Sequence, residues 1–179
     1  MKQVIILGTG GSSIKCPFDT EVWGVNAAIH WTPEYPIHRL FFFDDLRFFP
    51  KDRLTLADLK KFKGSTMTTE KNKKYAAQHG INLGLYPLNK VTKQFGTDYF
   101  NNSITYMIAL AMYERYEKLS LWGVDHMEKE ELGQARSGVE YWLGRAEQAG
   151  IKVDISVGSE LLTTHNNKIY GYEYSRGGK

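Results

Sequence analysis

The stretch VIILGTGGSSI, residues 4–14, decides the fold. Its first four residues are apolar, and small residues follow at once. A short β-branched run that ends at glycine is typical of a strand buried in a parallel sheet. We therefore expect a buried strand over 3–7. The turn after it either receives a ligand or simply joins two elements tightly.

Similar patterns recur along the chain and alternate with helical ones. The most regular helical spacing follows candidate caps at residues 101–103, and a second amphipathic stretch over 130–150 ends at Gly150. Further strands are predicted at EVWGVN (21–26), HRLFFFDD (38–45), GINLGLYPLN (80–89), KLSLWGVDHM (118–127) and IKVDISV (151–157). Strands that alternate with helices predict an α/β domain with a mostly parallel, twisted sheet flanked by helices.

Length and composition suit one soluble domain over 1–179. Of the 179 residues, 42% are hydrophobic and 24% charged, and no apolar run approaches the ~20 residues that cross a bilayer. We expect a cytoplasmic protein without a membrane span. A basic stretch over 46–80 is predicted to be a surface excursion or lid, and 163–179 a polar tail. The single cysteine excludes an internal disulfide, and the net charge of +3 favours anionic partners only mildly.

The glycine turn has the spacing G-x-G-G at Gly8, Gly10 and Gly11. It lacks the third glycine of the dinucleotide fingerprint and the lysine of a P-loop, which disfavours a nicotinamide cofactor or a triphosphate cradle of that kind. Backbone N–H groups and the hydroxyls of Thr9, Ser12 and Ser13 could still hold a diphosphate or a ribose.

Polar side chains end the other predicted strands, where ligands of open α/β sheets bind. The candidates are Asn26, Asp44 and Asp45, the helix start at Asn102 and Ser103, and the strand end at Gly123, Asp125 and His126. Paired carboxylates can bind a divalent ion, contact sugar hydroxyls or act as a base, and a histidine suits proton transfer near neutral pH. Turn formation and helix capping explain several of these residues equally well.

The order of the segments ILGTGGSS, WGVN, LFFFDD, NNSITYMIALAMYERYEKLSLWGVDH and GIKVDISVGSELL resembles the bacterial lipooligosaccharide sialyltransferases. It is also similar to the related motility accessory factor and hydroxymethylpterin diphosphokinase-like proteins, and to small phage-borne relatives. The resemblance covers most of the chain. It implies a modified Rossmann-like fold that binds a cytidine nucleotide sugar through these segments.

Carried over by residue, the resemblance assigns Gly8, Gly10 and Ser12 to the nucleotide turn and Asn26 to the strand end. It assigns Ser103 to the helix start, and Gly123 with Asp125 to the later strand end. Thr9 and Gly11 stand where the family has asparagine and proline. The family's catalytic base is a histidine beyond that later strand, and His126 is the histidine nearest to it.

The sequence therefore predicts a transferase that uses a nucleotide-activated donor, most simply a glycosyltransferase with a nucleotide sugar. Asp44, Asp125 or His126 would activate the acceptor, which is a glycan, a small molecule or a nucleic acid. A divalent metal is compatible with this chemistry but not required. Two alternatives stay open: a metal-dependent diphosphokinase, and a module that binds or sequesters a nucleotide without chemistry. A homo-oligomer is left open too.

Overall fold

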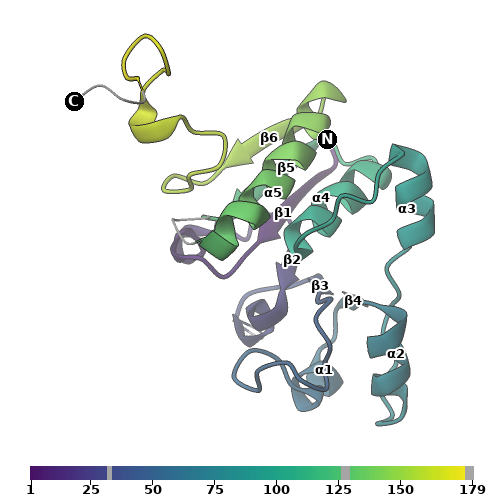
Figure 1. The fold of residues 1–179 in the computed structure, drawn as a ribbon. Coiled ribbons are helices and arrows are strands. Elements are labelled where there is room, and N and C mark those ends of the chain that lie inside the picture. Colours follow the sequence, from purple (N-terminus) through teal and green to yellow (C-terminus); the bar gives the residue numbers. More distant parts are fainter. Residues whose placement is uncertain (32–33, 126–129, 176–179) are drawn as a thin grey trace.

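Six parallel strands form one sheet in the order β4-β3-β2-β1-β5-β6 (Figure 1). The computed structural model describes residues 1–31, 34–125 and 130–175. The strands are β1 (Gln3–Leu7), β2 (Glu21–Val25), β3 (Arg39–Phe41), β4 (Ser65–Met67), β5 (Lys118–Trp122) and β6 (Lys152–Ile155). The predicted α/β class with a parallel sheet flanked by helices is confirmed.

Helices cover the sheet and connect its strands. They are α1 (Leu56–Lys61), α2 (Glu70–Ala77), α3 (Leu88–Phe95), α4 (Ser103–Tyr113) and α5 (Glu130–Gln148), with short 3₁₀ helices η1 (Gly11–Lys15), η2 (Asn26–Trp31) and η3 (His165–Asn167). Helices α4 and α5 lie side by side across one face of the sheet, and the tail after β6 extends away from it (Figure 1). In the part of the chain that the structure describes, no helix combines the length and apolar character that a membrane crossing needs.

The predicted helices α4 and α5 form because their apolar faces meet the main core. Met107 and Ile108 of α4, and Val139 and Leu143 of α5, are fully buried in the same cluster as β1 and β5. The side chain of Asn102 begins α4 by accepting a hydrogen bond from the N–H of Thr105 at 3.1 Å. This capping confirms the predicted helix start.

The middle of the chain differs from the sequence prediction. Residues 80–89 do not form a strand: they contribute one bridge between Thr68 and Leu85, and α3 begins at Leu88. Within the predicted excursion 46–80, residues 65–67 instead form edge strand β4, and 70–77 form α2. Three residues are too few for an alternating pattern, and α2 has little apolar surface to signal a helix.

Strand β1 lies at the point where the strand order reverses. The chain proceeds from β1 to β2, β3 and β4 on one side, and then returns through α4 to β5 on the other side of β1. In open α/β sheets, ligands bind at such a switch point, beyond the carboxyl ends of the strands. The crevice between the ends of β1 and β5 is therefore the first place to look for a site.

Candidate functional site

The glycine turn after β1 packs directly on the end of β5. The N–H of Gly8 donates to the carbonyl oxygen of Trp122, and that of Gly10 to the carbonyl oxygen of Gly123, both at 2.8 Å. A Cβ atom on Gly8 would lie 2.2 Å from the carbonyl oxygen of Gly123, where no side chain fits. These glycines are therefore required first for the close backbone contact between the ends of β1 and β5.

Ser12 and Asp125 form a polar pair at this junction. The backbone N–H of Ser12 donates to Oδ2 of Asp125 at 2.9 Å, and its hydroxyl bonds to Oδ1. The Ser12 Oγ atom also accepts from the N–H of Gly123 at 2.7 Å and lies 2.8 Å from the hydroxyl of Ser156. Asp125 is therefore a buried carboxylate engaged with the turn, rather than a free base.

The turn offers fewer free N–H groups than its sequence suggests. Those of Gly8, Gly10, Ser12 and Ser13 all donate to protein acceptors. Ser13 is itself buried and packs against Gly123. Within the described residues, the N–H groups of Thr9 and Gly11 have no acceptor and remain for a ligand.

A cleft of about 760 Å³ opens beyond the carboxyl ends of the strands. It brings together Gly8, Thr9, Gly10, Gly11, Asn26, Asp44, Asn102, Ser103, Gly123 and Asp125 from the sequence candidates. Ser12, Ser13 and Asp45 do not line it. His126 lies outside the described residues. The predicted convergence of strand ends and one helix start thus corresponds to a real cavity, of a size typical for small-molecule ligands.

Asn26 is the residue whose geometry points most directly to a ligand. It follows β2 with a positive φ of 43°, a conformation that asparagine tolerates better than most residues. Its side-chain oxygen is buried, yet it has no hydrogen-bond partner among the described residues. A buried acceptor without a donor costs about 1–3 kcal/mol, which a bound ligand with a suitable donor can recover.

Asn102 and Ser103 place the start of α4 at the cleft. The amide of Asn102 caps the helix and donates to the carbonyl oxygen of Ala135 at 2.9 Å, so this side chain is structural. Ser103 is the first helical residue, where backbone N–H groups and the helix dipole favour an anion. The two neighbours therefore differ: the side chain of Asn102 is engaged in the fold, whereas that of Ser103 makes no hydrogen bond to the described residues.

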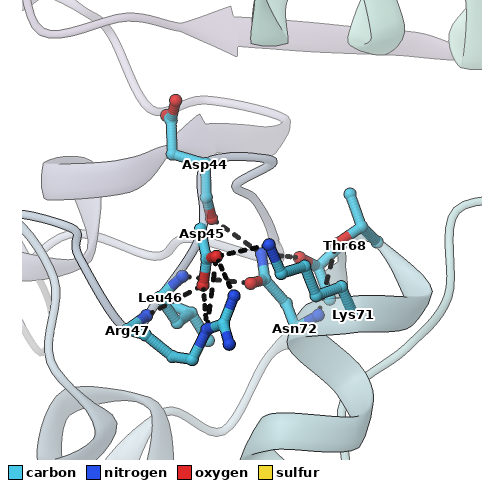
Figure 2. Close-up of polar contacts among 8 residues, drawn as sticks. Asp44, Asp45, Leu46, Arg47, Thr68, Lys71 and Asn72 are labelled. Carbon is cyan, nitrogen blue, oxygen red and sulfur yellow. Dashed lines mark hydrogen bonds and ion pairs between the residues drawn. The ribbon is translucent and has the colours of Figure 1, made fainter.

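The two aspartates after β3 point in different directions (Figure 2). Asp45 forms ion pairs with Arg47 and Lys71, each at 2.6 Å, and the Arg47 hydrogen bond above all holds the pKa of its carboxyl far below the usual range. The carboxyl group of Asp44 points away from this network, and Asp44 lines the cleft. The adjacent pair therefore does not act as one dicarboxylate site. Among the described residues, no group of three or more histidine, cysteine or acidic side chains is placed to hold a metal ion.

Asn72 of α2 fixes the segment that carries Asp44 (Figure 2). Its buried amide accepts from the N–H of Leu46 at 3.0 Å and donates to the carbonyl oxygen of Asp44 at 2.8 Å. It also donates to the hydroxyl of Thr68 at 2.9 Å. The polar helix α2 is thus anchored by a side chain that holds the cleft rim.

Sequence reasoning missed several residues of the cleft. Phe100 and Tyr106 line it beside Phe43, and the three rings form a stack with centroid distances of 4.0 and 4.4 Å. Arg53 lines it from the loop before α1. Phe43 could have been found as the last apolar residue before Asp44, whereas Arg53 belongs to no periodic pattern.

Comparison with known proteins shows the likeness at the level of structure. No family model matches the chain, and no curated protein matches its sequence significantly. The sialyltransferase CstII from Campylobacter jejuni, in complex with cytidine-5'-monophosphate, superposes with a TM-score of 0.55 at 17% identity, covering 90% of this chain and 84% of that one. CstII with a trisaccharide acceptor and CMP gives 0.57 at 22% identity, covering 89% and 84%.

The same enzyme in complex with the substrate analogue CMP-3FNeuAc gives a TM-score of 0.56 at 21% identity, covering 87% of this chain and 80% of that one. At these identities the likeness lies in the fold, and it extends over most of both chains. The chain therefore has a sialyltransferase-like, Rossmann-type α/β fold, as its sequence order suggested.

Proposed function

We propose that this protein is a glycosyltransferase that binds a nucleotide-activated sugar in the cleft at the β1–β5 switch point. The observation that carries the proposal is the buried, unpartnered side-chain oxygen of Asn26 at the wall of that cleft, which lacks a donor among the described residues. A sugar hydroxyl or a base amino group would supply the missing donor. The sialyltransferase-like fold supports the same class of ligand.

Other groups of the cleft suit different parts of the nucleotide sugar. The N–H groups of Thr9 and Gly11 and the start of α4 at Ser103 suit a phosphate or a ribose. Gly8, Gly10 and Gly123 shape the wall by keeping it free of side chains. The aromatic stack offers ring edges and a flat apolar border to the base or the sugar.

In the transfer step, an acceptor hydroxyl forms a bond to the anomeric carbon, and the bond from that carbon to the phosphate oxygen breaks. The nucleotide leaves with the electron pair, and a base takes the acceptor proton. Asp44 is our first candidate for this base, because it lines the cleft and its carboxyl group has no hydrogen-bond partner in the described part of the chain. His126 is the second candidate, from its place after the Asp125 strand end.

The test is a thermal-unfolding screen against nucleotides and nucleotide sugars, with and without magnesium. A ligand at ~100 times its dissociation constant adds about 2.7 kcal/mol to stability, which such a screen detects. Asn26→Gly removes the amide while tolerating the positive φ, so it should abolish the shift without unfolding the protein. Asn89→Ala, at an exposed position of α3 that does not line the cleft, is the control. No shift with any compound would sink the proposal.

A nucleotide-binding module without chemistry is the second candidate. The engagement of Asp125 with Ser12 favours it, because that carboxylate is not available to take a proton. Recovery of the bound nucleotide sugar unchanged, in the presence of a broad acceptor panel, would support the module. Release of free nucleotide together with a glycosylated acceptor would support the transferase.

A further inference from the structure

The charges that face the cleft are unbalanced for a nucleotide. Among the described lining residues, the charged side chains are Asp44, Asp125 and Arg53. The residues around a phosphate in this cleft thus carry two carboxyl groups and one guanidinium, and most N–H groups of the glycine turn already donate to protein acceptors. An anion that binds here therefore needs a nearby positive charge, and among the described lining residues Arg53 carries one.

Arg53 is held at the cleft by its neighbours in the chain. The N–H groups of Arg53 and Leu54 both point to the carbonyl oxygen of Pro50, at 3.0 and 3.3 Å, which closes a turn. Leu54 is buried in a hydrophobic cluster that also contains Leu59 of α1 and Leu40 of β3. The backbone of Arg53 is therefore anchored, while its side chain is exposed.

The guanidinium of Arg53 makes no hydrogen bond or ion pair with the described residues, unlike that of its loop neighbour. Arg47, six residues earlier, is bound to Asp45 through its Nε and Nη2 atoms. An arginine presents N–H donors in a planar fork that matches two phosphate oxygens. The guanidinium of Arg47 is therefore occupied by Asp45, whereas that of Arg53 has no partner among the described residues and can bind a ligand.

We propose that Arg53 binds the phosphate of the nucleotide donor and stabilises the charge of the departing nucleotide. This inference rests on the proposed function and adds a residue that positions the donor. Since the leaving nucleotide gains negative charge as its bond to the sugar breaks, a guanidinium at the phosphate stabilises the transition state more than the ground state.

The experiment measures binding by titration calorimetry of AMP, CMP, GMP and UMP, and of the four matching nucleosides, to the wild-type chain and to Arg53→Gln. For the nucleotide that binds best, we expect Arg53→Gln to weaken affinity by about tenfold, since a charge-assisted hydrogen bond is lost. Affinity for the nucleoside should not change. Arg53→Lys should restore part of the affinity, because it returns the charge without the fork.

Arg47→Gln is the matched control, because it removes an arginine of the same loop that faces Asp45 instead of the cleft. Unfolding midpoints of the Arg53 variants should agree with the wild type, since Arg53 is exposed. If Arg53→Gln and the wild type bind the nucleotide equally, the role of Arg53 is overturned and the proposed function stands. If the wild type binds none of the eight compounds, both proposals fail together.

Discussion

Gly8 and Gly123 meet backbone to backbone just beyond the ends of β1 and β5: a Cβ atom on Gly8 would lie 2.2 Å from the carbonyl oxygen of Gly123, and one on Gly123 would lie 2.6 Å from that of Gly8. This contact joins β1 to β5 at the switch point of the sheet. Both glycines also line the cleft. The same glycines thus serve the fold and the site.

Replacing Gly8 by alanine should lower the free energy of unfolding by about 3 kcal/mol, because the new methyl group meets a backbone oxygen that cannot move aside. Chemical denaturation measures the loss. The control is Gly11→Ala, whose Cβ would lie 3.8 Å from Asp125, an ordinary contact. Equal stability of the two variants would contradict the close approach.

Asn72→Ala should destabilise the protein by about 2–3 kcal/mol, since it leaves the N–H of Leu46 and the carbonyl oxygen of Asp44 without their buried partner. Hydrogen exchange should accelerate over 44–54, the loop that carries Asp44 and Arg53. Lys71→Ala, one residue away, removes only a surface ion pair and should leave the stability nearly unchanged. Unchanged exchange in the loop of the Asn72 variant would refute the anchoring role.

Glu21 gives the stability a pH dependence. Burial raises the pKa of its carboxyl, but hydrogen bonds from Trp23 and Tyr116, with Arg39 nearby, outweigh burial and leave that pKa below its ordinary value. A lowered pKa in the folded state stabilises above the unfolded value of ~4.3, and this stabilisation is lost as the pH falls through the folded pKa.

Glu21→Gln should therefore be less stable than the wild type at pH 7, by about 1 kcal/mol given its partial exposure. The difference should shrink as the pH falls through the lowered pKa of the folded wild-type carboxyl, because that group then becomes neutral as well. Denaturation curves at several pH values check this, with exposed Glu147→Gln as the control. A difference that does not change with pH would assign the effect to shape rather than charge.

Asp44→Asn should separate chemistry from binding. If Asp44 takes the acceptor proton, the substitution lowers the transfer rate by about 10²-fold or more, while donor affinity stays close to that of the wild type. The assay follows release of free nucleotide. Asp45→Asn is the comparison, because its carboxylate is occupied by Arg47 and Lys71 and should leave the rate nearly unchanged. A slow Asp45 variant beside a normal Asp44 variant would reverse the assignment.

The strongest sequence patterns predicted the parts of the fold that bury long apolar faces. β1 and α4 show them plainly, because every turn of α4 contributes buried residues and β1 is apolar from Val4 to Leu7. By contrast, β4 has three residues, and α2 buries only Ala76 in a hydrophobic cluster and is anchored mainly through the amide of Asn72. Local periodicity carries no signal for elements whose burial depends on distant polar partners.

The sequence could predict which strand ends lie together around the cleft, but not the contacts among their side chains. Parallel strands bring their carboxyl ends to one edge, so Asn26, Asp44 and Asp125 could be expected near the glycine turn. The sequence pattern does not predict two details of the cleft region. The bond between Ser12 and Asp125 depends on the strand register, and the divergence of Asp44 and Asp45 depends on the contacts with α2. Arg53 lies in a loop without a periodic pattern, so its place at the cleft could not be predicted from the sequence.

The aromatic stack that borders the cleft continues into the helical layer. Phe100 lies on Tyr106 on one side and on Trp142 of α5 on the other, with the latter ring centroids 5.2 Å apart and nearly parallel. The ring of Phe100 therefore separates Trp142 from the cleft. In a variant whose other three tryptophans are phenylalanine, the emission of Trp142 would follow occupancy of the cleft in real time, without a label.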